Sequence, residues 1–193
     1  EGDYLVLLNN DIEILTENWL EIMLGYAQQE HIGAVGAKLY YKDDTIQHAG
    51  VILGIGGVAG HSHKMYDRSS YGYFGRLVLN GNYGAVTAAC LMVKKSKFNE
   101  VSGLNEENLS VAFNDVDFCI KLLEHGYYNV CLSTVEAYHY ESKSRGEENT
   151  KSKQKRFIKE INYMKEKWSD YIESDPYYSP NLTLDREDFS IRI

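Results

Sequence analysis

The sequence has little cysteine and proline and no long apolar run. Only three of its 193 residues are cysteines, at positions Cys90, Cys119 and Cys131, widely spaced among apolar neighbours. An odd number at such spacing suits reduced core thiols better than a disulfide framework or a zinc site, which favours the cytoplasm. No stretch reaches the roughly 18 apolar residues that a spanning helix needs, and no basic region followed by an apolar core marks a signal peptide. The sequence therefore predicts a cytoplasmic protein without a spanning segment.

Basic residues are also in the minority. The chain carries 20 Lys and Arg against 28 Asp and Glu, which gives a formal net charge of −8. This excess of acid argues against nucleic acid as a partner, although a metal ion could still recruit phosphate to an acidic pocket. The basic run at 151–159 indicates a solvated helix face; the alternative is peripheral contact with an anionic membrane, at its inner face.

The composition, with 44% hydrophobic and 25% charged residues, is typical of one globular domain. We expect this domain to span residues 1–170. Residues 171–193 are expected to form a C-terminal tail or arm lying on another surface, because Ser174-Asp175-Pro176 ends the regular pattern. The strand-like pattern begins directly after Glu1-Gly2-Asp3 with no cap or turn, so we expect a fragment of a longer fold.

Strands and helices alternate along the chain. The apolar run at 4–8 is typical of a buried parallel strand. A helix is predicted after this strand, and Thr16 is expected to cap it. Further strands are predicted at 34–41, 47–53, 82–93, 128–132 and 136–140, and further helices at 115–125 and 157–168. The glycine-rich stretch 54–60 and the polar stretch 62–76 predict a long mobile loop. A free strand edge near Tyr4 favours a homo-oligomer.

Polar residues stand at the ends of several of these elements. Each has an ordinary structural interpretation as well as a functional one: Asp11 as a turn residue, Asp115 as a helix cap, His139 as a packed histidine. His48 and the pair in His61-Ser62-His63 could form a zinc cluster, but their polar loop favours contact with an acceptor or solvent. The glycines at 54–59 loosely fit a dinucleotide fingerprint, yet no helix follows them.

Four passages together resemble family 2 glycosyltransferases. They are Leu7-Leu8-Asn9-Asn10-Asp11, Val86-Thr87-Ala88-Ala89-Cys90-Leu91-Met92-Val93, Asn114-Asp115-Val116-Asp117-Phe118-Cys119 and Tyr138-His139-Tyr140-Glu141-Ser142-Lys143-Ser144-Arg145-Gly146. The resemblance is to inverting, rhamnosyltransferase-like enzymes of polysaccharide biosynthesis. It implies an α/β fold: the C-terminal portion of a GT-A mixed-sheet sandwich, lacking the N-terminal nucleotide-binding βα units. We therefore expect a partial catalytic domain that is inactive by itself.

The resemblance also implies a role for each matching residue. Asp11 and His139 correspond to ligands of Mg²⁺ or Mn²⁺, and Asp115 corresponds to the catalytic base, with Asp117 beside it as a second catalytic position. Expected donor and phosphate contacts are Asn9, Asn10, Lys143 and Arg145; expected acceptor contacts are Thr87, Ala88, Ala89 and Asn114. A carboxylate that takes the acceptor proton and a cation on the diphosphate are what a single displacement needs.

The partners implied are a nucleotide-diphosphate sugar donor and a saccharide or polyprenyl-linked saccharide acceptor, in bacterial cell-surface polysaccharide synthesis. Asn9 and Asn114 stand where the family's pattern has acids. These substitutions leave open a non-catalytic carbohydrate-binding or scaffolding module derived from such an enzyme. A nucleotide-binding oxidoreductase is a third hypothesis, and it rests on the glycine run alone.

Overall fold

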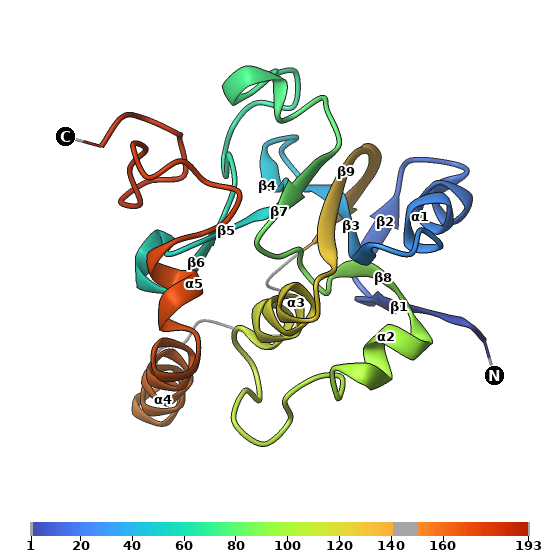
Figure 1. The fold of residues 1–193 in the computed structure, drawn as a ribbon. Helices are drawn as coiled ribbons and strands as arrows, with labels where there is room; N and C mark the ends of the chain where they lie inside the picture. Colours follow the sequence, from blue (N-terminus) through green and yellow to red (C-terminus); the bar gives the residue numbers. More distant parts are fainter. Residues whose placement is uncertain (1, 141–149, 193) are drawn as a thin grey trace.

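A seven-stranded mixed sheet forms the centre of the protein (Figure 1). The computed structural model describes residues 2–140 and 150–192. The strands of the main sheet are β1 (Tyr4–Leu8), β2 (Ile12–Ile14), β3 (Ile32–Tyr40), β4 (Ile46–His48), β7 (Gly81–Tyr83), β8 (Cys90–Lys94) and β9 (Tyr128–His139). The main order is β1-β8-β3-β9-β2, with β4 on β3 and β7 on β9. Among the described residues of the main sheet, β3 and β9 pair in parallel, and all other pairs of strands are antiparallel. The expected α/β fold with a mixed sheet is confirmed.

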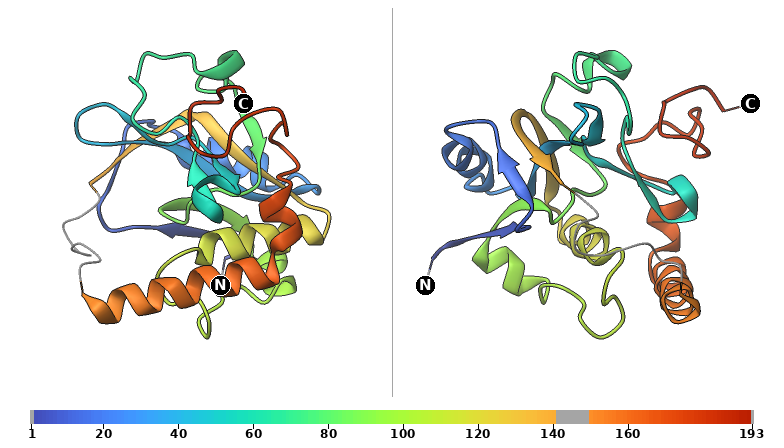
Figure 2. Two further views of the ribbon diagram at one scale, coloured as in Figure 1. Left: turned by 90° about the vertical axis from the view of Figure 1, so that its left-hand side faces the viewer. Right: turned by 180° about the vertical axis from the view of Figure 1, so that it is seen from behind.

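Helices cover both faces of the sheet (Figure 2). The helix α1 (Trp19–Ala27) packs Met23 and Ala27 against one face, and α3 (Asn114–Glu124) packs Phe118 and Leu122 against the other. The remaining helices are α2 (Lys95–Glu100), α4 (Lys151–Lys167) and α5 (Ser169–Glu173). Met164 of α4 joins the α3 side of the core. The cysteines predicted to be core thiols are free and buried, and burial raises the pKa of Cys90 and of Cys131 to about 12.

The expectation that the first strand is a buried parallel strand is wrong. Strand β1 runs antiparallel to β8 at one end of the described sheet. Val6 and Leu8 on its outer face are 37% and 47% exposed. A continuous apolar run fixes strand formation, but it carries no information about the neighbour that pairs with the strand.

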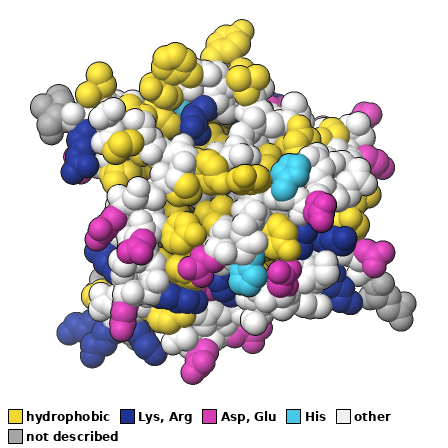
Figure 3. All heavy atoms as spheres, viewed as in Figure 1, with side chains coloured by type: hydrophobic (Ala, Val, Ile, Leu, Met, Phe, Trp, Pro, Cys, Tyr) yellow, Lys and Arg dark blue, Asp and Glu magenta, His cyan; other side chains and the backbone are white. Residues whose placement is uncertain are grey.

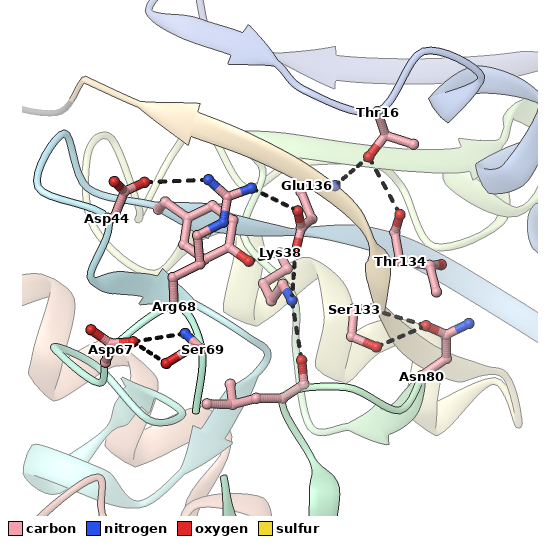
Figure 4. A network of polar contacts seen from close by, with 12 residues as sticks. Thr16, Lys38, Asp44, Asp67, Arg68, Ser69, Asn80, Ser133, Thr134 and Glu136 are labelled. Carbon is pink, nitrogen blue, oxygen red and sulfur yellow. Dashed lines mark hydrogen bonds and ion pairs between the residues drawn. The ribbon is translucent and has the colours of Figure 1, made fainter. Parts of the chain in front are cut away.

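One predicted helix cap and four predicted strands also differ from the structure. Thr16 does not cap α1, which begins after Asn18; its hydroxyl donates to the carbonyl of Thr134 and accepts from the backbone N–H of Glu136 (Figure 4). The two strands expected at 128–132 and 136–140 are the single strand β9. The strands expected at 47–53 and 82–93 are each broken, the first at Gly50, whose φ is +97°.

The glycine-rich stretch forms a hairpin instead of a long loop. Strand β5 (Val51–Leu53) pairs antiparallel with β6 (Ala59–His61), and the short helix η1 (Ile55–Gly57) lies between them. This hairpin also excludes the dinucleotide fingerprint, which needs a strand, a tight turn and a helix. The segment after it contains η2 (Tyr73–Gly75).

A polar network ties the segment after β6 to the sheet (Figure 4). Arg68 pairs with Glu136 of β9 at 2.9 Å and with Asp44 at 3.3 Å. Lys38 of β3 pairs with Glu136 at 2.9 Å and donates to the carbonyl of Leu77 at 3.1 Å. Hydrophobic side chains gather on the outside of this segment (Figure 3), where Tyr71, Phe74, Val78 and Leu79 are exposed.

Residues 171–192 lie against the chain's own surface. Phe189 is buried, and its ring stacks on His63 with the ring centroids 4.4 Å apart. Leu182 packs with Ile52 and Ile55 in one small apolar cluster. Among the helices of residues 2–140 and 150–192, none combines the length and the apolar character needed to cross a membrane.

Candidate functional site

A pocket of about 400 Å³ collects residues from six separate segments of the chain. Its walls come from the end of β1, the segment of β4 and β5, the hairpin strand β6, the turn between β7 and β8, the start of α3 with the loop before it, and the end of β9. The predicted site residues that line it are Asn9, Thr87, Ala88, Ala89, Asn114, Asp115 and His139. Positions far apart in the sequence therefore meet in one cavity.

At one end of the pocket, β1 delivers Asn9 and β9 delivers His139. The Asn9 amide nitrogen lies 3.2 Å from His139 Nε2, and Asp11 Oδ1 lies 3.2 Å from the same nitrogen. His139 Nδ1 lies 2.7 Å from the side-chain oxygen of Gln47. An amide oxygen only accepts, so Nδ1 carries the proton and Nε2 presents its lone pair toward Asp11.

This arrangement fits a divalent cation. Asp11 Oδ1 is buried and has no hydrogen-bond donor among the described residues, so an acceptor is left unsatisfied beside the Nε2 lone pair. A carboxylate and a neutral imidazole oriented by a second-layer hydrogen bond are ligands that Mn²⁺ accepts. Among the residues that the structure describes, no three His, Cys, Asp or Glu side chains form a group that could hold a metal alone. A cation here would need further oxygen ligands, such as the phosphates of a substrate.

The start of α3 brings Asp115 into the pocket. Its Oδ2 accepts from the backbone N–H of Ala88 at 3.1 Å, and its Oδ1 accepts from the N–H of Val116 at 3.0 Å. Each carboxylate oxygen keeps a second lone pair, because an ionised carboxylate offers about four acceptor positions. The hydrogen bond to Ala88 fixes Asp115 against the turn before β8, which also lines the pocket.

Asn114 organises the loop before α3. Its side-chain oxygen accepts from the N–H of Asn105 at 2.8 Å, and its nitrogen donates to the carbonyls of Asn105 and Leu109. It is the first residue of α3 and not its cap; Phe113, with φ of +62°, precedes the helix. Its predicted role as an acceptor contact stays a prediction, with both ends of the amide already bonded within the chain.

Sequence reasoning missed Glu160. This side chain of α4 is 1% exposed and accepts at 3.0 Å from the backbone N–H groups of Ser110 and Val111, and at 3.2 Å from that of Ala112. It therefore fixes the loop that forms one wall of the pocket. The only sequence signal was one acid on the apolar side of an amphipathic helix.

Asp117 does not lie at the pocket. It is fully buried, and its Oδ1 lies 2.9 Å from Lys167 Nζ and 2.8 Å from the indole nitrogen of Trp168, which donates to it. Its Oδ2 lies 3.2 Å from Lys121 Nζ. Two positions along a helix turn a side chain to a different face, so Asp117 faces α4 and α5 while Asp115 faces the pocket. The expected pairing of the two carboxylates is not formed.

One other predicted phosphate contact, Asn10, is exposed and does not line the pocket. Lys143 and Arg145 fall outside the described residues, so their predicted role stays a prediction.

Two further histidines lie at or beside the pocket. His61 of β6 lines it, and His48 of β4 lies behind His61 with the two Nδ1 atoms 2.8 Å apart. Burial, followed by the charges of His61 and His139, holds the pKa of His48 well below its usual range. His63 is turned away from the pocket: it stacks on Phe189, and its Nε2 accepts from the N–H of Tyr73 at 2.9 Å. A shared zinc cluster is therefore not formed among these described histidines.

A solved glycosyltransferase structure has a fold similar to that of this chain. The crystal structure of GalNAc-T7 with UDP, GalNAc and Mn²⁺ superposes with a TM-score of 0.62, at 10% identity, over 96% of this chain and 36% of that one. The chain has a glycosyltransferase-like fold. No family model matches the sequence.

Two curated proteins are similar in sequence to this glycosyltransferase-like chain. The uncharacterized protein y4gI of Sinorhizobium fredii is 51% identical over 188 residues, 97% of this chain. The O-antigen biosynthesis protein RfbC of Myxococcus xanthus is 32% identical over 200 residues, 99% of this chain. The chain spans only 21% and 15% of the lengths of these relatives.

Proposed function

We propose that this chain is the metal- and acceptor-binding part of an inverting, family 2 glycosyltransferase that acts in bacterial surface-polysaccharide assembly. The observation that carries the proposal is the meeting of Asn9, Asp115 and His139 at one pocket of a glycosyltransferase-like fold. The similarity to an O-antigen biosynthesis protein supports the same substrate class.

Asp115 is proposed as the base that takes the proton of the attacking acceptor hydroxyl. Its two bonds from backbone N–H groups hold the carboxylate at the pocket wall without neutralising it. A base fixed in this way contributes typically ~10²–10⁴-fold to the rate of a proton transfer. Thr87, Ala88 and Ala89 line the pocket beside it and are proposed to contact the acceptor.

Asp11 and His139 are proposed to hold Mg²⁺ or Mn²⁺, with the donor's diphosphate completing the ligand set. When bound, such a cation would offset the negative charge that develops on the leaving diphosphate. Gln47 keeps His139 in the tautomer whose Nε2 bears a lone pair, and the Asn9 amide donates to that nitrogen beside Asp11. GalNAc-T7, the structural neighbour, was crystallised with UDP, GalNAc and Mn²⁺, which supports a nucleotide sugar as the donor here.

A non-catalytic carbohydrate-binding module is the second candidate. It is favoured by the engagement of both Asp115 oxygens with backbone N–H groups, which makes this carboxylate a structural anchor as well as a candidate base. In that case sugars would still bind in the pocket, and no turnover would occur.

The deciding experiment is sugar transfer by the complete protein with a panel of nucleotide sugars and Mn²⁺, with Asp115→Asn beside the wild type. The proposal expects turnover in the wild type and its loss in a folded Asp115→Asn protein. Sugar binding without turnover would favour the second candidate, and equal turnover in both proteins would remove Asp115 as the base.

A further inference from the structure

His48 and His61 form a pair whose geometry fixes where their protons lie. The rings meet edge to face at 86°, with 5.0 Å between centroids, and the two Nδ1 atoms are 2.8 Å apart. At that distance one Nδ1 must carry a proton and the other must accept it. The hydrogen-bond partners of the other His48 nitrogen decide which Nδ1 carries the proton.

The other nitrogen of His48 faces two backbone donors. The N–H of Gly50 points at His48 Nε2 from 3.4 Å and the N–H of Thr87 from 3.5 Å, so Nε2 is an acceptor. The single proton of a neutral His48 is then on Nδ1 and is donated to His61 Nδ1. His61 in turn carries its own proton on Nε2.

This chain of bonds also opposes a proton on His61 Nδ1. A proton on His61 Nδ1 would set two N–H groups against each other across 2.8 Å. Moving the His48 proton to Nε2 would relieve that clash, but it would oppose the donors of Gly50 and Thr87. His48 is 1% exposed, so its unmatched polar atoms would have no water to turn to.

The histidine pair and Asp115 are fixed to adjacent backbone positions. The N–H of Thr87 bonds His48, and the N–H of the next residue, Ala88, bonds Asp115 Oδ2. His61 and Asp115 both line the pocket, so a ligand seated there meets both of them. The turn at 87–88 thus sets the spacing between a carboxylate acceptor and an imidazole donor.

We propose that His61 is a substrate-positioning residue that donates a hydrogen bond from Nε2–H to a sugar hydroxyl in the pocket, with His48 fixing its tautomer. This inference rests on the function proposed above. An imidazole N–H is a hydrogen-bond donor, and a sugar hydroxyl oxygen accepts such a bond. The hydroxyl belongs either to the donor sugar or to the acceptor sugar.

The test uses His61→Gln and His61→Asn in the complete protein. The glutamine amide nitrogen reaches the place of histidine Nε2, and the asparagine nitrogen reaches the place of Nδ1. We expect kcat/KM to fall about 10-fold in His61→Asn and to stay within about 3-fold of wild type in His61→Gln, which is the scale of one hydrogen bond. Melting temperatures check that both variants are folded.

Deoxy analogues identify the hydroxyl. One deoxy analogue, of the donor sugar or of the acceptor sugar, should lower kcat/KM about 10-fold in the wild type and in His61→Gln. The same analogue should cause no further loss in His61→Asn, which already lacks the hydrogen bond. Equal kinetics in both variants and the wild type, or equal losses in both variants without dependence on any analogue, would overturn the inference.

Sugar dissociation constants from calorimetry give a second readout. If the wild type binds sugars but does not transfer them, the proposed catalytic function fails. The His61 contact would still be supported if Kd for the sugar rises in His61→Asn but not in His61→Gln, and if one deoxy analogue weakens binding only where the contact is present. Identical Kd values in both variants and the wild type would overturn it.

Discussion

The carboxylate of Asp115 accepts a hydrogen bond at 3.1 Å from the backbone N–H of Ala88, 27 positions earlier in the chain. This bond joins the start of α3 to the turn before β8, and both segments line the pocket. A catalytic base needs to be held in place and still have a lone pair for the substrate. The single bond to each oxygen of Asp115 meets both needs.

Asp115→Asn should remove turnover while preserving the fold. The amide keeps an oxygen for one of the two backbone donors but cannot take a proton, so kcat should fall by about 10²–10⁴-fold. Steady-state transfer assays on the complete protein measure this. Glu124→Gln, at the exposed far end of the same helix, is the matched control and should leave kcat unchanged. A fall in both variants would point to a disturbed helix instead.

Asp117→Asn should lower stability more than activity. The substitution removes the charge that pairs with Lys121 and Lys167 in a fully buried position, and breaking a buried pair typically costs about 3–5 kcal/mol. Urea unfolding gives the free energy, and kcat is measured well below the melting temperature. We expect kcat within a few-fold of wild type; a loss comparable to that of Asp115→Asn would restore Asp117 as a catalytic residue.

Glu160→Ala should destabilise the protein and disturb the pocket wall. The change leaves the N–H groups of Ser110, Val111 and Ala112 without their acceptor, which should lower the free energy of unfolding by about 3 kcal/mol or more. Glu166→Ala, on the exposed face of α4, should stay within about 0.5 kcal/mol of wild type. Similar losses in both variants would attribute the effect to helix charge and not to the loop.

Gln47→Leu should weaken binding of Mn²⁺. Without the Gln47 oxygen, His139 Nδ1 loses the acceptor of its proton, so Nε2 is held less firmly as a lone-pair ligand. Loss of such an orienting partner costs about 10–100-fold in metal affinity. Titration with Mn²⁺ followed by electron paramagnetic resonance, with UDP present, measures it. Gln28→Leu at the exposed end of α1 serves as the control; unchanged affinity in Gln47→Leu would count against His139 as a ligand.

We expect the free energy of unfolding to fall in mild acid because of His63. Burial, with the charge of Arg76 second, lowers the pKa of His63 to about 4 in the folded state. The unfolded chain takes up a proton near pH ~6.5, and the folded protein does not, so stability is highest above that pH and falls as pH drops toward 4. The loss attributable to His63 should reach about 3 kcal/mol at pH ~4.

The matched variant for this pH effect is His63→Gln. Its side-chain oxygen can accept the N–H of Tyr73 in place of Nε2, and it does not titrate. The difference in unfolding free energy between wild type and variant, measured by urea between pH ~4 and ~7, isolates His63 from other groups. A difference that does not change with pH would contradict the prediction.

Several features of this protein are determined by local sequence. The apolar run of β1, the basic turn of α2, and the span of α3 up to Gly126, whose φ is +82°, follow from residues within a few positions of one another. The resemblance to family 2 glycosyltransferases also predicted that Asp11, Asp115 and His139 meet at one site. Asp115 and His139 line one pocket, and Asp11 lies beside His139 without lining it.

Tertiary structure alone decided which carboxylate faces the pocket and what holds it there. Asp117 is bound by Lys167, 50 positions away, and the loop at 110–112 is held by Glu160, also about 50 positions away. The hairpin of β5 and β6 brings His61 against His48. Periodicity reflects interactions within one or two turns of the chain, whereas the partner of a buried polar group is chosen by packing between distant segments, so sequence alone cannot specify it.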